Sequence, residues 1–180
     1  MKNYLTALAA LMVIAGCKKE ASDLPAATQT GANTFGAMVN GKTWAPQGFG
    51  VVHTAPLLEA HYVNAHRDVL INARNFASEP TETEFEIYLQ QVTQPGTYWL
   101  NSNTAHSPDQ SASYGYYIKR KLMPDNEWIT NATFTGRVDI TYTDTVNHIV
   151  SGTFSFDAIN MYGNADTLHV TDGRFDVKLK

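Results

Sequence analysis

Apolar and polar residues alternate with a period of two along most of the chain, which is typical of β-strands with one buried face. The clearest case is 136–158, where Val138, Ile140 and Tyr142 share one face of a first strand. After turn-forming residues, 150–156 continue the same period. We therefore predict a β-hairpin over 136–158.

The same pattern recurs in shorter runs along the rest of the chain. Residues 57–66 fit either a strand or a short helix, and the strand is favoured because the neighbouring segments alternate. Asn40-Gly41 and 94–96 have turn composition. The further predicted strands are 38–39, 43–45, 69–73, 85–92, 97–100, 114–119 and 175–179.

About nine or ten short strands separated by turns predict an all-β fold. The connections are too short for the crossovers that a parallel sheet needs, so the sheet is expected to be antiparallel. We predict a β-sandwich or a barrel-like sheet over 34–180, with the sandwich preferred.

The N-terminal residues form a separate element with its own chemistry. Lys2 precedes an apolar run over 4–15 that is too short to span a bilayer, as in the leader of a secreted protein. The run ends at Ile14-Ala15-Gly16-Cys17, which resembles the lipobox of bacterial lipoproteins. The resemblance implies a signal peptide over 1–16, cleavage between Gly16 and Cys17, and lipidation of Cys17.

Residues 17–33 are polar and without periodicity, and we predict a flexible tether. Lys18 follows the lipid-bearing position in place of the Asp of known inner-membrane lipoproteins, so the outer membrane is expected. Lys19, Glu20 and Asp23 resemble the charged surface-export signal of Bacteroidota lipoproteins. The periplasmic and the cell-surface face both stay open.

Composition narrows the function classes. The formal net charge of −4 becomes −5 without the leader, because the leader carries Lys2 and no acid. Nucleic acid is therefore excluded as a partner, since its binding needs clustered basic residues. The single cysteine leaves the domain without a disulfide or a thiolate metal site. We expect no cofactor.

Catalytic and metal-binding patterns are weak. Six histidines are scattered without HxH or HExxH spacing, and His61 and His66 would point to opposite faces of one strand. We expect no metal site and no catalytic residues. A glycan hydrolase would need a pair of acids, which Asp139 or Asp157 could form with Glu84 or Glu86. Acidic residues at outward strand positions are more often solvated than catalytic.

Aromatic residues give the best indication of binding. The predicted strands carry more aromatic side chains than one inward face can bury, among them Tyr98, Trp99, Tyr114 and Tyr116. Exposed rings beside amides and carboxylates suit stacking on sugar faces. The alternative is packing on both faces of the sheet.

Two triplets, Asp144-Thr145-Val146 and Asp166-Thr167-Leu168, resemble the Asp-Thr-apolar acceptor for O-linked glycans on exported Bacteroidota proteins. Thr145 and Thr167 are therefore possible O-glycosylation sites.

Three motifs in order resemble a family of Bacteroidota lipoproteins of unknown function. They are V-N-G-x-x-W at 39–44, S-G-T-F-x-F at 151–156 and T-x-G-R-F-D-V at 171–177, with Gly96-Thr97-Tyr98 between the first two. The resemblance implies a compact β domain and a lipid anchor, and it supplies no catalytic residue. We expect a lipid-anchored envelope protein that binds a glycan or an envelope protein, or has a structural role. The alternative is an envelope hydrolase acting on glycans.

Overall fold

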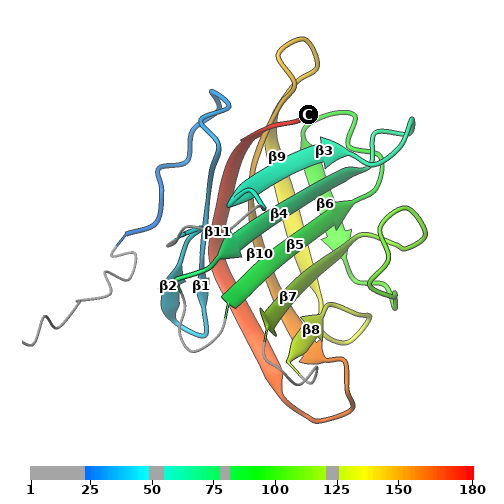
Figure 1. Cartoon of the computed structure of the whole chain (residues 1–180). Coiled ribbons are helices and arrows are strands. Elements are labelled where there is room, and N and C mark those ends of the chain that lie inside the picture. The colour runs from blue at the N-terminus through cyan, green and yellow to red at the C-terminus, as the bar shows by residue number, and fades with distance from the viewer. Residues whose placement is uncertain (1–22, 49–54, 78–81, 121–125) are drawn as a thin grey trace, which may run out of the picture.

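The computed structural model describes residues 23–48, 55–77, 82–120 and 126–180. The predicted cleavage and lipidation site at Gly16 and Cys17 lies outside these ranges, and so does His53. The described residues form strands and no helix (Figure 1). In chain order these strands are β1 (Thr34–Val39), β2 (Lys42–Trp44), β3 (Leu58–Tyr62), β4 (Val69–Asn75), β5 (Glu82–Leu89), β6 (Gly96–Leu100), β7 (Tyr114–Arg120), β8 (Glu127–Ile129), β9 (Gly136–Asp144), β10 (Ile149–Asn160) and β11 (Thr167–Lys178).

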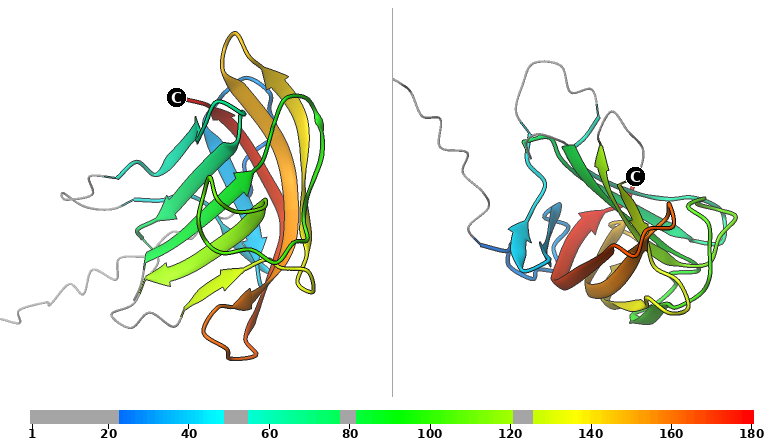
Figure 2. Two further views of the ribbon diagram at one scale, coloured as in Figure 1. Left: turned by 90° about the vertical axis from the view of Figure 1, so that its right-hand side faces the viewer. Right: turned by 90° about the horizontal axis from the view of Figure 1, so that it is seen from below.

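One hydrogen-bonded path runs through the sheet in the order β2-β1-β11-β10-β8-β7-β5-β4-β3. The long strand β10 forks, because its first part pairs with β9 and its last residues pair with β8. β6 continues the β9 branch as an edge strand. The sheet curls around a single interior, as the two views in Figure 2 show.

Two contacts join parts of the curled sheet that lie far apart in the strand order. The backbone N–H of Lys180, just after β11, donates to the carbonyl of Ala60 on β3 at 3.0 Å. Gln47, after β2, forms a bridge with Asn75 at the end of β4. The all-β, antiparallel prediction is confirmed, and its barrel-like form describes the fold, since one curled sheet forms a half-barrel instead of two stacked sheets.

The side chains that point inward from the strands form the core. Phe85 lies near its centre, with the ring centroids of Trp44 at 4.7 Å and Phe35 at 5.5 Å. The buried indole N–H of Trp44 donates to the hydroxyl of Thr83 at 2.8 Å. Each such large side chain stabilises the fold by about 1.5–3 kcal/mol through burial.

Phenylalanine side chains of the curled strands lie over glycines of the neighbouring strands. A Cβ added at Gly173 would come within 2.5 Å of the Phe154 ring, so the tight approach requires glycine. The three cross-strand pairs of this kind are Phe154 with Gly173, Phe175 with Gly152, and Phe156 with Gly136. They let the sheet bend sharply around β10.

Most of the predicted strands are present. The segment 57–66 contains β3, so the strand reading is confirmed over the helix. Asn40 and Gly41 both have positive φ, 48° and 76°, as the predicted turn requires. β8 was not predicted from the sequence, because its three residues are too short to show a period.

No helix within the described ranges is long and apolar enough to cross a membrane.

Candidate functional site

The four aromatic residues singled out from the sequence lie in three different environments. Trp99 on β6 is 59% exposed. Tyr98 points inward, is half-buried against the core, and donates its hydroxyl to the carbonyl of Gln94 at 2.8 Å. Tyr114 and Tyr116 are buried on the outer face of β7. Of the four rings, only that of Trp99 is presented to solvent.

Trp99 belongs to a group of outward side chains that we call the β6–β9 face: Thr97 and Trp99 of β6, and Arg137 and Asp139 of β9. Thr97 lies opposite Asp139, and Trp99 lies opposite Arg137. The Thr97 hydroxyl donates to Asp139 Oδ1 at 2.6 Å, and Arg137 Nε lies 3.1 Å from Asp139 Oδ2. A hydroxyl, a carboxylate and a guanidinium are thus connected beside an exposed indole.

The β6–β9 face continues onto β10. Thr153 lies opposite Asp139, and Ser155 lies opposite Arg137, so further hydroxyls extend the polar surface. An indole ring can stack on the C–H face of a sugar, while the neighbouring groups bond its hydroxyls. This arrangement suits a binding surface for a polar ligand with one apolar face.

A second group, the outer tyrosine cluster, lies on the other branch of the sheet, where β10 is followed by β8, β7 and β5. It comprises Tyr88, Tyr114, Tyr116, Glu86 and His106. The His106 ring, from the β6–β7 connection, is stacked on Tyr116 with centroids 3.8 Å apart. His106 Nε2 lies 3.0 Å from Glu86 Oε1, and the Tyr114 hydroxyl donates to the same oxygen. The cluster attaches this connection to the sheet.

The electrostatics of the outer tyrosine cluster favour a fixed ionisation state. Burial raises the pKa of Glu86, but hydrogen bonds from His106, Tyr114 and Asn72 outweigh it, so the pKa lies below its usual range. Burial and the bond to Glu86 raise the pKa of Tyr114 far above its ordinary value. Glu86 is therefore held as an anion with its acceptors occupied. A general acid for glycoside cleavage needs the opposite, a raised carboxyl pKa.

The sequence-derived acid pairs are not brought together. Glu84 and Glu86 lie on β5, whereas Asp139 and Asp157 lie on β9 and β10, with β7 and β8 between β5 and β10. Their partners also differ. Glu84 lies 3.0 Å from Arg74 Nε and 2.7 Å from Arg120 Nη2, and Asp157 lies 2.7 Å from His169 Nδ1.

Within the described ranges, no group of three or more His, Cys, Asp or Glu side chains could hold a metal ion. His61 lies on β3, and His66 lies in the turn that follows it.

The two possible O-glycosylation sites differ in accessibility. Thr145 is exposed in the turn between β9 and β10. Thr167 is half-buried in β11 and pairs with Ile159 of β10. Thr145 is therefore the more accessible of the two hydroxyls.

Sequence reasoning missed the partners of Trp99. Thr97 shares the parity of Trp99 on the predicted strand 97–100, so it could have been found. Arg137 could not, because β6 and β9 are distant in the chain and only the register places the two side by side.

Comparison with known proteins gives a family without an assigned activity. No curated protein matches the chain, and no solved structure matches it. A family model matches residues 58–177, from the first residue of β3 to the last but one residue of β11. Since the match covers more than half of the chain, the protein belongs to the family described as a domain of unknown function, DUF6252.

Proposed function

We propose that this protein is a lipid-anchored, non-catalytic protein of the cell envelope that binds a glycan on the β6–β9 face. The observation that carries the binding proposal is the exposed indole of Trp99 beside connected polar groups. Burying such a ring would stabilise the domain by about 2–3 kcal/mol. Its exposed position is therefore better explained by a ligand than by folding.

The position of Trp99 on a regular strand supports the same proposal. The backbone of β6 is held by its ladder with β9, so the ring and the groups of the β6–β9 face keep a fixed spacing. A preorganised surface binds with a smaller entropic cost than one on a loop. An open outer face of this kind fits an extended glycan chain better than a small enclosed ligand.

The binding test compares the full chain, acylated and purified in detergent, with Trp99→Ala on a glycan array and then by calorimetry. We expect Trp99→Ala to lower affinity roughly thirtyfold, as removal of a central aromatic contact does. Tyr162→Ala is the matched control, because Tyr162 is also exposed, at 50%, but lies in the β10–β11 turn. Absence of glycan binding, or equal affinity of the Trp99 variant, contradicts the proposal.

An envelope hydrolase acting on glycans is the competing function. It would use a carboxylate–imidazole pair, and the outer tyrosine cluster offers Glu86 with His106, in addition to the exposed pair of Asp157 with His169. We expect no turnover of ester or glycoside substrates. Turnover that Glu86→Gln abolishes in a folded variant would refute the non-catalytic proposal.

Lipid attachment is supported by the motif at 14–17 and is tested separately. In cells, the wild-type chain is expected to incorporate labelled palmitate, whereas Cys17→Ser is expected to incorporate none and to remain unprocessed or soluble. Fatty-acid labelling of Cys17→Ser would contradict the anchor. Fractionation then places the acylated protein in the outer membrane or elsewhere.

A further inference from the structure

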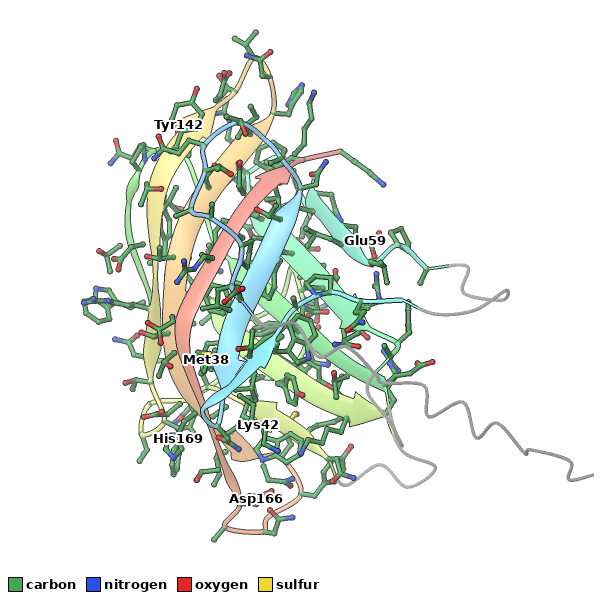
Figure 3. The ribbon with its side chains drawn as sticks, turned by 90° about the vertical axis from the view of Figure 1, so that its left-hand side faces the viewer. Met38, Lys42, Glu59, Tyr142, Asp166 and His169 are labelled. Atoms are coloured by element: carbon green, nitrogen blue, oxygen red, sulfur yellow. The ribbon has the colours of Figure 1, made fainter. Side chains whose placement is uncertain are left out.

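Residues 24–33, within the segment expected from sequence to be a tether, lie against the sheet. They pass over the outer face of β1 and β11, on the side of the molecule viewed in Figure 3. We call residues 24–33 the strap. The strap precedes β1 directly, so it is the last part of the path from Cys17 to the domain.

Asp176 of β11 holds the centre of the strap. Its carboxylate has no exposed surface and accepts backbone N–H bonds from Thr30 at 2.9 Å, Gly31 at 2.8 Å and Ala32 at 3.2 Å. The hydroxyls of Thr28, at 2.6 Å, Thr30, at 3.3 Å, and Ser151, at 2.7 Å, also donate to it. Donors converging on one anion form strong, directional contacts, so this part of the strap is firmly attached.

Other contacts hold the two ends of the strap. Near its start, Arg174 Nη1 donates to the carbonyl of Pro25 at 3.4 Å. A Cβ added at Gly36 would lie 2.6 Å from Pro25 Cδ, so the proline ring sits directly on the glycine. At its end, the side-chain oxygen of Asn33 accepts a bond from the backbone N–H of Lys178 at 3.0 Å.

We infer that the strap, clamped by Asp176, makes the outer face of β1 and β11 the membrane-proximal face and holds the domain close to the bilayer instead of on a long tether. This inference rests on the proposed lipid anchor at Cys17. Eight peptide units separate Cys17 from Pro25, and they span at most about 29 Å in any conformation. A tether that remained free to Asn33 would span about 58 Å.

The partner of this face is the lipid surface itself, because the acyl chains fix Cys17 there. The consequence for function is a restricted reach. The β6–β9 face belongs to the same rigid sheet as the strap, so its ligand must also lie near the membrane. A glycan attached to that membrane, or lying along it, meets this requirement.

Two measurements test the inference on the full acylated chain in phosphatidylethanolamine–phosphatidylglycerol vesicles. The first is limited proteolysis, with the released fragments identified by mass. Wild type is expected to release fragments that begin no later than residue 25, whereas Asp176→Asn should also be cut within 26–33, about tenfold faster than wild type. Wild-type cleavage within 26–33 as fast as before residue 24 would overturn the inference.

The second measurement is energy transfer to labelled lipid headgroups from a dye at Lys42→Cys, an exposed position on the viewed side (Figure 3). Gly36→Ala is the milder variant, since it displaces Pro25 without removing a buried charge. Transfer is expected to fall in Gly36→Ala and Asp176→Asn. It should stay unchanged in Gly96→Ala, whose added Cβ meets nothing within 4 Å.

Equal transfer in all folded variants contradicts the inference. Failure of the lipid anchor gives a different result, because the wild-type chain would then lack acyl groups and would not bind vesicles. In that case the membrane-proximal face is also refuted, whereas the proteolysis of the unacylated chain still reports whether the strap is clamped.

Discussion

Asp176 shows how far the role of one residue depends on contacts distant in the chain. From the sequence it is an outward polar position of the last strand, between the inward Phe175 and Val177. In the structure the strap covers it and makes it fully buried. No pattern within the predicted strand 175–179 indicates this, since the strap donors lie about 145 residues earlier.

The buried carboxylate of Asp176 predicts a specific pH dependence. Burial raises its pKa, but the hydrogen bonds from the strap and from Ser151 lower the pKa by more. The folded pKa therefore lies well below its usual value of 3.8. The stability from the ionised form is therefore present above about pH 4 and is lost as pH falls through the folded pKa. Asp176→Asn should lower the free energy of unfolding at pH 7 by about 3 kcal/mol and flatten this acid dependence.

Urea unfolding from pH 7 down to about pH 2 measures both effects. Asp172→Asn is the matched control, because Asp172 is exposed on the same strand and asparagine tolerates its positive φ of 52°. An equal loss of stability in the two variants would show that Asp176 has no special role.

At the scale of elements, the period of two predicted strands well but not their curvature. The strand positions follow from alternation, which is a local property. The bend around β10 depends instead on glycines opposite phenylalanines, and that pairing requires the register. The choice between sandwich and barrel could not be made from the sequence for this reason.

The Phe154–Gly173 pair predicts a coupled response to mutation. Gly173→Ala places a Cβ 2.5 Å from the Phe154 ring, and we expect a loss of about 1–3 kcal/mol through overpacking. In a Phe154→Leu background the same change should cost less, since the smaller side chain leaves room. Additive losses in this double-mutant cycle, measured by urea unfolding, would contradict the tight pairing; Gly96→Ala should have little effect.

The β6–β7 connection gives a second prediction at this scale. His106→Ala removes the stack on Tyr116 and the contact with Glu86, so stability should fall by about 1–2 kcal/mol. Hydrogen exchange should accelerate mainly within 101–113. His66→Ala, at an exposed turn position, is the control. Uniform acceleration over the whole chain would argue against a local attachment.

For the whole molecule, the sequence predicted a single β domain with a lipid-bearing terminus, but not which surface could bind. The aromatic excess was visible, yet Tyr114 and Tyr116 are buried by the β6–β7 connection while Trp99 is not. Exposure depends on which elements cover a sheet face. The spatial arrangement therefore leaves Trp99 as the one exposed ring among the four candidate ligand-binding aromatic residues.

The contact between the end of β11 and β3 depends on the two residues after β11. Leu179 is 5% exposed and its backbone N–H donates to the His148 carbonyl at 2.7 Å, while Lys180 bonds Ala60 on β3. A chain ending at Lys178 should lose about 3 kcal/mol, from the burial of one leucine and two hydrogen bonds. Hydrogen exchange in β3 should accelerate most, because β3 then has only β4 as a neighbour. Lys180→Ala keeps the backbone N–H and should leave the free energy of unfolding unchanged. Equal destabilisation by both changes would show that these backbone hydrogen bonds do not hold the end of β11 against β3.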